Sequence, residues 1–387
     1  MIDKPIPYGH QHITEEDIQA VVETLQSDYL TQGPKITEFE QVFARYVGAQ
    51  YAVSVNNATA GLHLAASALG VKSGDKVVVT PMTFAASANC IRYCGGEVVF
   101  CDIDPQTYLM DLHKLRHLLG SYPKGTFQGI VPVDFAGYPH QMEEFRQLAD
   151  EYGLWILEDA CHAPGGYFMD SKGEKQCCGN GKFADLSVFS FHPVKHIATG
   201  EGGMVTTDNK TLYERLCLLC THGITKNPAL LHENHGGWYY EMQELGYNYR
   251  LTDFQAALGL SQLKRADEGL KRRQKIAVRY NEAFKRIADI QTPYASPDVF
   301  HAYHLYIIQV PDRLDLYNYL HENGIYAQVH YIPLHLMPYY REQGNKPGDL
   351  PVAEKYYSRC LSLPMFPTLT DEEQEYVIKK IEYYFNK

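Results

Sequence analysis

The sequence has little basic charge, no long apolar stretch and no leader-like start, and each absence excludes a class of protein. Lys and Arg number 35 against 46 Asp and Glu, giving a formal net charge of −11. This balance argues against binding to nucleic acid or to an anionic membrane, because both need a broad basic face. No run of about 18 apolar residues occurs, so no membrane span is predicted. Residues 1–10 lack an apolar signal region, and we therefore predict a cytoplasmic protein.

A disulfide framework and a zinc site are also not expected. The nine cysteines are an odd number, which favours reduced thiols where no secretory signal is seen. Cys217 and Cys220, and the adjacent Cys177 and Cys178, have spacings that invite a zinc interpretation. A second pair at ligand spacing is not evident, and Cys217 lies in an apolar helical run where a thiol behaves as a small hydrophobe. We therefore predict structural thiols and no metal.

What is present is a regular alternation of strand-like and helix-like segments in a chain of 387 residues with 45% hydrophobic residues. Such alternation predicts an α/β fold, with a mostly parallel sheet covered by helices on both faces. The expected strands are residues 51–55, 76–80, 97–103, 129–134, 154–158, 187–191 and 204–207.

Two helical patterns precede this region. Thr14 precedes acidic residues and an apolar stripe of Ile18, Val21, Val22 and Leu25, which predicts a capped amphipathic helix. A second helix is expected to end at Gly48.

The C-terminal third reads as a smaller α+β unit. A long helical region at 252–287 leads into it, and we place the boundary there, giving domains 1–260 and 261–387. The unit's expected elements are strands near 304–310 and 326–330 and helices at 351–361 and 370–385.

Two loops carry a chemical signal, because ligands of parallel sheets collect at the carboxyl ends of the strands. The segment 158–162, which contains Asp159, directly follows the apolar run 154–157, and Lys195 lies just past the apolar run 187–191. An acid and a lysine so placed suit pyridoxal phosphate, since the acid keeps the pyridine nitrogen protonated and the lysine forms a Schiff base. A helix cap or a salt-bridge partner is the simpler alternative for either residue.

A nicotinamide site is a weaker alternative. Residues 179–184 match the pattern G-x-G-x-x-A, but the preceding stretch is polar, whereas the fingerprint must follow a buried strand and begin a helix. We therefore reject an oxidoreductase.

A family resemblance extends along nearly the whole chain. Ordered sequence motifs resemble those of the DegT/DnrJ/EryC1/StrS sugar aminotransferases, which are fold-type I pyridoxal phosphate enzymes. The resemblance implies a large, mostly parallel seven-stranded sheet domain and a smaller C-terminal α+β domain. The matching segments are residues 29–33, 57–62, 81–84, 133–137, 158–162, 189–195, 200–203, 246–253 and 327–331.

The resemblance assigns the cofactor contacts residue by residue. It makes Lys195 the Schiff-base lysine and proton shuttle, and Asp159 the partner of the pyridine nitrogen. His162 would lie beside the cofactor's phenolic oxygen, with a merely packed histidine as the alternative. Ser190 would bind the cofactor phosphate, and Phe84 would stack on the pyridine ring.

Further contacts involve a helix start and a second subunit. Ala58 and Thr59 begin a helix, whose free N–H groups suit the phosphate. The resemblance implies a homodimer with shared active sites, in which Asn248 reaches the partner's cofactor phosphate. Arg250 would lie near the nucleotide phosphates of the substrate, where its planar fork suits their oxygens.

Four more residues would line the nucleotide-sugar pocket. They are Thr31, Gln32, His330 and Tyr331. Two departures from the family pattern stand out: the segment 170–182 is longer than the corresponding loop, and Ala58 replaces a common Gly.

The implied reaction is transfer of an amino group from L-glutamate to a UDP-linked 4-keto-6-deoxy sugar. Within the family, segments 133–137, 189–195 and 327–331 most resemble the branch that serves pseudaminic acid biosynthesis. The alternatives are another nucleotide-linked 4-keto or 3-keto deoxysugar, a sugar dehydratase, and a binding protein with an inactive fold. A dehydratase would carry His in place of Lys195, and an inactive protein would have lost Lys195 or Asp159.

Overall fold

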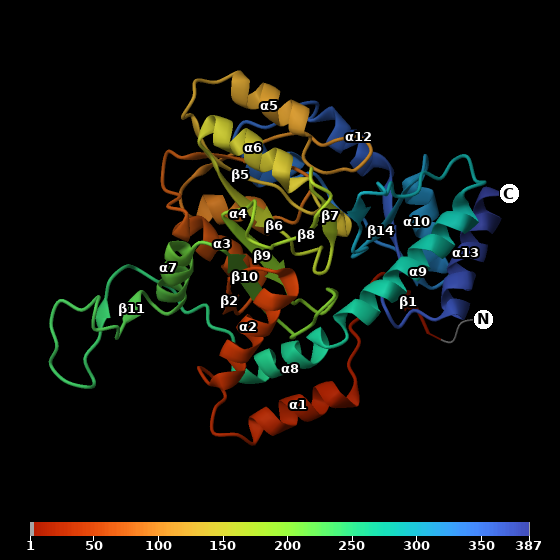
Figure 1. Cartoon of the computed structure of the whole chain (residues 1–387). Helices are drawn as coiled ribbons and strands as arrows, with labels where there is room; N and C mark the ends of the chain where they lie inside the picture. The colour runs from red at the N-terminus through yellow and green to blue at the C-terminus, as the bar shows by residue number, and fades with distance from the viewer. Residues whose placement is uncertain (1–3, 387) are drawn as a thin grey trace.

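Seven strands form one sheet at the centre of the protein, described here from a computed structural model covering residues 4–386 (Figure 1). The strand order is β2-β10-β9-β6-β5-β3-β4. β10 runs antiparallel to its two neighbours, and the other pairs are parallel. The predicted α/β fold with a mostly parallel seven-stranded sheet is confirmed. The strands are β2 (Tyr51–Val55), β3 (Lys76–Val79), β4 (Glu97–Phe100), β5 (Phe127–Val131), β6 (Trp155–Asp159), β9 (Leu186–Ser190) and β10 (Gly203–Thr207).

Alternate residues of these strands enter cores on opposite faces of the sheet. Val77 and Val79 belong to a core with α3, α4 and α7, whereas Val78 packs with α5 and α6. Phe189 of β9 packs with α2 and α8. Covering helices on both faces explain why the strands are apolar on both sides. The helices are α2 (Pro34–Val47), α3 (Ala58–Ala68), α4 (Ala86–Tyr93), α5 (Leu112–Gly120), α6 (Met142–Tyr152), α7 (Lys210–Cys220) and α8 (Asp253–Leu263).

The predicted amphipathic helix α1 (Glu15–Leu25) is present, but its apolar stripe faces outward. Ile18 and Leu25 are 49% and 54% exposed, whereas Asp17 is buried. The reason is an ion pair: the Arg265 guanidinium and the Gln262 amide both donate to the Asp17 carboxylate. This polar contact holds α1 against α8 and leaves the apolar stripe uncovered.

The C-terminal part has its own apolar cluster, built around α9, α10, α13 and β14. The division at residue 260 stays a prediction; it falls within α8. The elements of this part are α9 (Ala266–Phe284), β13 (Val299–Phe300), β14 (Tyr306–Gln309), α10 (Arg313–Glu322), β15 (Ile325–Tyr326), α11 (Pro338–Glu342), α12 (Pro351–Arg359), β16 (Cys360–Leu363) and α13 (Asp371–Phe385), with a short 3-10 turn at Leu334–Leu336.

Three expectations for this part were wrong. The helix at 252–287 is two helices, because Arg265 leaves helical geometry (φ −116°, ψ 13°) where it pairs with the N-terminal segment. The strand at 326–330 ends at Tyr326; beyond it Gln328 makes a single bridge to Ser362 of β16, and the His330 carbonyl accepts from the Tyr356 hydroxyl instead of from a neighbouring strand. The helix at 351–361 ends at Arg359, and the strand β16 that follows pairs with β14.

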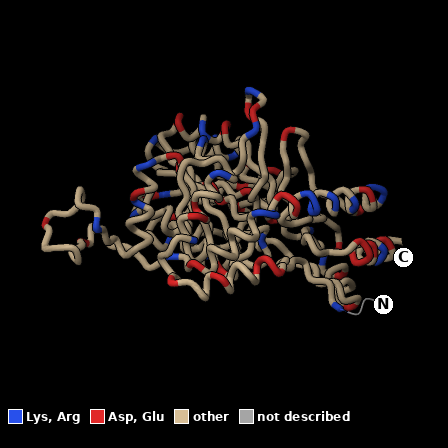
Figure 2. The backbone as a smooth tube through the Cα atoms, turned by 60° about the horizontal axis from the view of Figure 1, so that its bottom comes forward, with Lys and Arg blue, Asp and Glu red and all other residues tan. Residues whose placement is uncertain are grey.

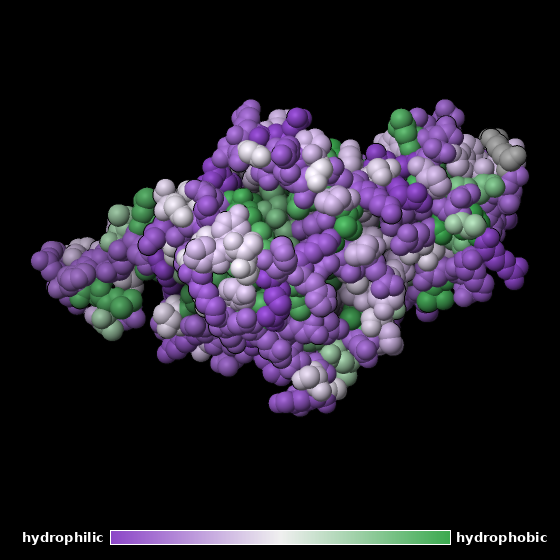
Figure 3. Space-filling model, turned by 90° about the horizontal axis from the view of Figure 1, so that it is seen from above, coloured by the Kyte–Doolittle hydropathy of each residue, from purple (hydrophilic) through white to green (hydrophobic). Residues whose placement is uncertain are grey.

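Two hairpins project from the large sheet. The long segment 170–182 supplies the turn and the second strand of a hairpin of β7 (Tyr167–Met169) and β8 (Lys175–Cys177), which makes a three-stranded sheet with β13. The second hairpin is an arm at residues 222–246, with β11 (Ile224–Thr225) and β12 (Glu241–Met242). The arm stands away from the rest of the chain, and apolar residues gather near its end (Figures 1 and 3). Its exposed apolar residues are Leu230, Trp238, Tyr240, Met242 and Leu245.

The N-terminal strand β1 (Ile6–Pro7) pairs with β15, which ties the first described residues to the C-terminal part. Lys and Arg are interspersed with Asp and Glu over the face drawn in Figure 2. Within residues 4–386, none of the helices is both long enough and apolar enough to cross a membrane.

Candidate active site

A cavity of about 790 Å³ lies at the carboxyl ends of β6 and β9, where the sequence predicted a ligand site. Most of the predicted site residues line it. They are Ala58, Thr59, Phe84, Asp159, His162, Ser190, Lys195, His330 and Tyr331. Residues that the sequence did not single out line it too, among them Tyr8, Thr83, Ser87, Cys161, Glu201 and His304.

Asp159 is the last residue of β6 and is 5% exposed. The Ser87 hydroxyl donates to its Oδ2 at 2.6 Å, and the Cys161 backbone N–H donates to its Oδ1 at 3.1 Å. The Thr83 and Ser87 hydroxyl oxygens are 2.7 Å apart. Because the Ser87 proton goes to the carboxylate, Thr83 donates to Ser87. Donors thus hold the carboxylate in one orientation and stabilise its charge.

Lys195 lies in the loop that follows β9. Burial disfavours its ammonium form and lowers the pKa of Lys195 to about 8, while Asp159 and Cys161 act in the opposite direction and Arg273 adds to the lowering. Its Nζ lies 3.4 Å from Nε2 of His304. A lysine with this pKa has a substantial neutral fraction near pH 7 to 8, and only the neutral amine is a nucleophile.

Buried imidazoles surround this lysine. The Ala136 backbone N–H donates to Nδ1 of His162 at 3.2 Å, so a neutral His162 carries its proton on Nε2, which lies 3.3 Å from the Tyr331 hydroxyl. The ring centroids of His162 and His304 are 4.4 Å apart. Burial and the nearby Lys195 place the pKa of both histidines well below 6.5. Both side chains are therefore neutral. His162 packs against His304 and also makes a polar contact with Tyr331.

The other end of the cavity suits an anion. Asn57 caps α3 by accepting from the Ala60 N–H, and Ala58 and Thr59 form the first turn, whose N–H groups have no acceptor within the helix. A Cβ on Gly203 would meet the Ala58 nitrogen at 2.9 Å, so only glycine allows β10 to pass this close to the helix start. Ser190, paired with Gly203 in the sheet, adds a hydroxyl on the same side.

Aromatic side chains form the rim. Phe84 is 62% exposed, and its ring centroid is 6.4 Å from that of Tyr331. An exposed aromatic ring at the mouth of a polar cavity suits stacking on a planar ligand. His330 lies behind, where its Nδ1 contacts the Ser362 hydroxyl at 2.8 Å.

Four predicted residues lie outside the cavity. Thr31 bridges to Thr252 and Asn248 bridges to Thr221, near the base of the arm. Gln32, next to Thr31, and Arg250 do not line the cavity either. The chain itself does not bring these four residues to Lys195, and the use of Asn248 and Arg250 by a second subunit stays a prediction.

The most informative residue that sequence reasoning missed is His304. Its Nδ1 is buried without a partner among the described residues, and its carbonyl accepts from Arg273 at 3.2 Å. A signal was present, since His301 and His304 interrupt the apolar run that precedes β14. Ser87 gave no comparable signal, because a serine on a small-residue helix is common.

The residues present fit pyridoxal phosphate. The cavity combines a fixed carboxylate, a lysine with a lowered pKa, an aromatic ring and a helix start for a phosphate. Each group matches one part of the cofactor: the pyridine nitrogen, the carbonyl carbon, the ring face and the phosphate.

Comparison with known proteins agrees with this chemistry. The model of the DegT/DnrJ/EryC1/StrS aminotransferase family matches residues 11–382. The chain is 41% identical to the spore coat polysaccharide biosynthesis protein SpsC of Bacillus subtilis, over 97% of this chain and 96% of that protein. It is 37% identical to UDP-4-amino-4,6-dideoxy-N-acetyl-beta-L-altrosamine transaminase of Campylobacter jejuni, over 96% and 95% of the two chains.

A solved structure gives the same result. Helicobacter pylori PseC, an aminotransferase involved in the biosynthesis of pseudoaminic acid, superposes with a TM-score of 0.89 at 30% identity, over 99% of this chain and all of that one. Solved sugar aminotransferases of similar fold include pyridoxal phosphate and pyridoxamine phosphate forms. The chain belongs to the DegT/DnrJ/EryC1/StrS family and is a pyridoxal phosphate-dependent sugar aminotransferase that acts on nucleotide sugars.

Proposed function

We propose that the enzyme transfers the amino group of L-glutamate to a UDP-linked 4-keto-6-deoxy sugar of the N-acetyl-L-altrosamine type. The observation that carries the chemistry is the placement of Lys195 and Asp159 in one cavity with the start of α3. The substrate is supported by the relatives named above and by the matching segments at 133–137, 189–195 and 327–331. The alternative substrate is another nucleotide-linked 4-keto or 3-keto deoxysugar.

The chain's own residues divide the work. Bound in the cavity, the cofactor supplies an electron sink and a carbonyl carbon that carries the amino group. Lys195 would be the neutral amine that holds the cofactor, and it would be the base that takes and returns the proton of the donor's α-carbon. Asp159 would keep the ring nitrogen protonated, and the Ser87 hydroxyl holds the Asp159 carboxylate in place for this. Lys195 in the cavity favours transamination over dehydration.

Roles at the periphery follow from position. Ser190 and the N–H groups of Ala58 and Thr59 would hold the cofactor phosphate, and Phe84 would cover one face of the ring. His162 would donate from Nε2 toward the cofactor's phenolic oxygen or to Tyr331. His330 and Tyr331 would contact the nucleotide sugar in the cavity, whereas Thr31 and Gln32 lie outside it and would contact the sugar only in the site of a partner subunit.

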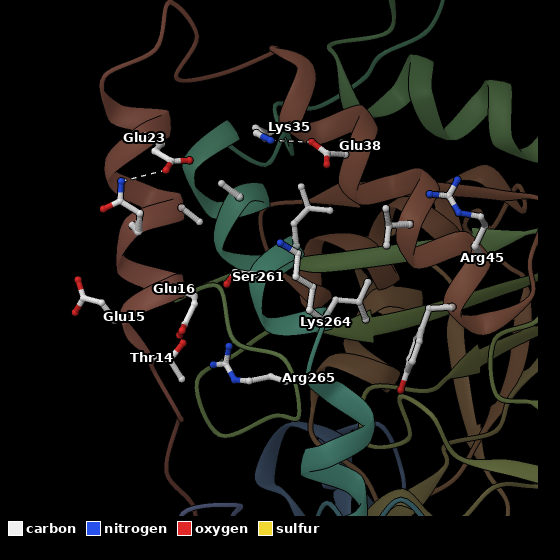
Figure 4. A pocket seen from close by; sticks show the side chains of 17 residues that line it. Thr14, Glu15, Glu16, Glu23, Lys35, Glu38, Arg45, Ser261, Lys264 and Arg265 are labelled. Atoms are coloured by element: carbon white, nitrogen blue, oxygen red, sulfur yellow. Dashed lines mark hydrogen bonds and ion pairs between the residues drawn. The ribbon is translucent and has the colours of Figure 1, made fainter.

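We also propose a homodimer in which Asn248 and Arg250 complete the partner's site. In support, the stripe Ile18, Val22 and Leu25 and the apolar end of the arm are exposed. Beside this stripe, a groove of about 1050 Å³ runs between α1, α2 and α8. Figure 4 shows its charged rim, with Glu side chains from α1, Lys35, Glu38 and Arg45 from α2, and Lys264 and Arg265 just past the end of α8. An apolar area with a polar rim is typical of an interface between subunits.

The substrate proposal is tested with the two C5-epimeric UDP-4-keto-6-deoxy sugars and L-glutamate as donor. The sugar that yields 2-oxoglutarate and a 4-amino product is the substrate. NMR of the product shows whether the new amine is equatorial or axial, and hence from which face it is delivered. Turnover of a GDP- or dTDP-linked keto-sugar in preference to both UDP-sugars would refute the assignment of UDP as the nucleotide. A donor other than L-glutamate supporting faster turnover would refute the donor.

The dimer proposal is tested by mixing two inactive variants. Asn248→Ala should damage the partner's site and Lys195→Ala its own, so hybrid dimers should regain one intact site. Recovery of activity after unfolding and refolding the mixture, but not of either variant alone, is the expected result. A monomer by light scattering, or no recovery, would refute shared sites.

A further inference from the structure

A pair of buried carboxyl groups lies directly behind Asp159, and the reaction does not use it. Asp134 follows β5 and is fully buried, and Glu158 is the residue before Asp159 in β6 and is 3% exposed. Ligand atoms of Asp134, Glu158 and the buried Cys178 all lie within 4.8 Å of one another. The carboxyl groups are also within hydrogen-bond reach of each other.

One oxygen of each carboxyl group accepts hydrogen bonds from ordinary donors. Oδ1 of Asp134 accepts from the backbone N–H of His140 at 2.9 Å and contacts its Nδ1 at 3.0 Å. Oε2 of Glu158 accepts from the Ser187 hydroxyl at 2.6 Å and from the Gly179 N–H at 3.1 Å. The remaining oxygens, Oδ2 of Asp134 and Oε1 of Glu158, are buried and have no conventional donor among the described residues.

No neighbouring cation balances two negative charges. Within residues 4–386, neither carboxyl group has a Lys or Arg at ion-pair distance, and the one basic contact is His140. Burial lowers the pKa of His140 to about 3, so its ring is neutral. Burial raises the pKa of the Cys178 thiol, which therefore remains a donor and not a thiolate. Two ionised carboxylates would repel each other in this buried site.

We propose that Glu158 is held as a carboxylic acid that donates its proton to Asp134, so that the pair carries one negative charge and positions Asp159. A single proton between the two unpartnered oxygens satisfies both of them. Asp134 is the charged partner because it already accepts from the backbone N–H of His140, and the Cys178 thiol lies beside it as a neutral group. The raised pKa of both carboxyl groups, caused first by burial, agrees with one retained proton.

The pair joins the chain segments that hold Asp159. The Asp134 N–H donates to the Asp159 carbonyl at 3.1 Å, and the Asp159 N–H donates to the Pro132 carbonyl at 2.9 Å. Glu158 adds β9 through Ser187 and the turn after β8 through Gly179. Asp134 and Glu158 are thus positioning residues: they touch neither cofactor nor substrate, and they fix the end of β6 relative to its two neighbouring strands. This assignment does not depend on which sugar the enzyme uses.

Infrared spectroscopy of the cofactor-free protein tests the proton directly. Wild-type protein labelled with ¹³C at the glutamate side-chain carboxyl should show, at neutral pH, one shifted band of a protonated carboxylic acid. This band should vanish in Glu158→Gln. Glu174→Gln, at an exposed carboxylate on the neighbouring hairpin, is the matched control and should remove only a carboxylate band. A wild-type spectrum without a protonated glutamate would overturn the proposal.

Cofactor binding gives the second readout. Glu158→Gln mimics the neutral acid and its amide can still donate to Asp134, so its dissociation constant for pyridoxal phosphate should stay within about threefold of wild type. Glu158→Ala loses the donor and should bind at least tenfold more weakly. Equal losses in both variants would overturn the proposal, as would one equivalent of a divalent metal in the wild type that Glu158→Gln releases. These readouts need no turnover, so they do not fail if the proposed substrate is wrong.

Discussion

Replacing the catalytic lysine should make the cofactor-free protein more stable. Folding forces Lys195 into a site that disfavours its charge, with Arg273 adding repulsion and Asp159 offsetting only part of it. Its pKa falls from 10.5 to about 8, and each pKa unit corresponds to about 1.36 kcal/mol, so the cost is about 3 kcal/mol. Lys195→Met removes the charge and keeps the length of the side chain. We expect a gain of about 1–3 kcal/mol at neutral pH, since contacts of the amine are lost as well.

The sign of the pH dependence follows from the two pKa values. Below about pH 8 both folded and unfolded states carry the ammonium, and the folded state bears the full cost. Between about pH 8 and 10.5 the unfolded chain holds a proton that the folded protein has released, so wild-type stability rises with pH in this window. The advantage of Lys195→Met should therefore shrink across it.

Urea unfolding of cofactor-free wild type and variant, at neutral pH and at about pH 9.5, measures the effect. Lys72→Met, at an exposed lysine in the turn before β3, is the control and should change stability by only a few tenths of a kcal/mol. A variant that is less stable than wild type at neutral pH, or whose advantage is the same at both pH values, would refute the reasoning.

Three further predictions concern the surroundings of the site. Ser87→Ala removes a hydrogen bond to the Asp159 carboxylate worth about 1.5–3 kcal/mol, so kcat should fall about tenfold or more; an unchanged kcat would show that the bond is dispensable. Gly203→Ala puts a Cβ 2.9 Å from the Ala58 nitrogen and should destabilise the protein by about 1–3 kcal/mol and weaken phosphate binding, measured by thermal unfolding with and without cofactor. Because burial raises the pKa of the Asp134–Glu158 pair, the folded protein keeps a proton that the unfolded chain releases, so stability should fall as pH rises above 4.5; Glu158→Gln should flatten this slope, and an equal slope in both proteins would contradict it.

The sheet could be predicted from the sequence because its signal is local. Short runs such as 76–80 have apolar residues on both faces of the strand, and in the structure Val78 and Val79 pack into different cores. Elements that depend on distant partners could not be found this way. The strand Cys360–Leu363 exists because β14 lies beside it, and β15 ends at Tyr326 ahead of His330, whose carbonyl accepts from the distant Tyr356 hydroxyl.

The candidate site shows the same difference between residues with a local sequence signal and residues without one. Asp159 and Lys195 were found because each follows an apolar strand, and the family resemblance added Phe84, Ser190 and Tyr331. His304 and Ser87 were missed. Their importance lies in which atoms they approach after folding, and no spacing in the sequence encodes a contact between residues 87 and 159 or between 195 and 304.

The short sheet of β7, β8 and β13 has a consequence for how ligands enter. β13 leads into the C-terminal part, and it is pinned to the β7–β8 hairpin by backbone pairing and by the parallel rings of Tyr167 and Phe300, 5.0 Å apart. A hinge that swung the C-terminal part open would have to break this ladder. We therefore expect a nucleotide sugar to be admitted by rearrangement of side chains at the mouth of the cavity, so that the enzyme selects its substrate by the shape of a nearly rigid entrance.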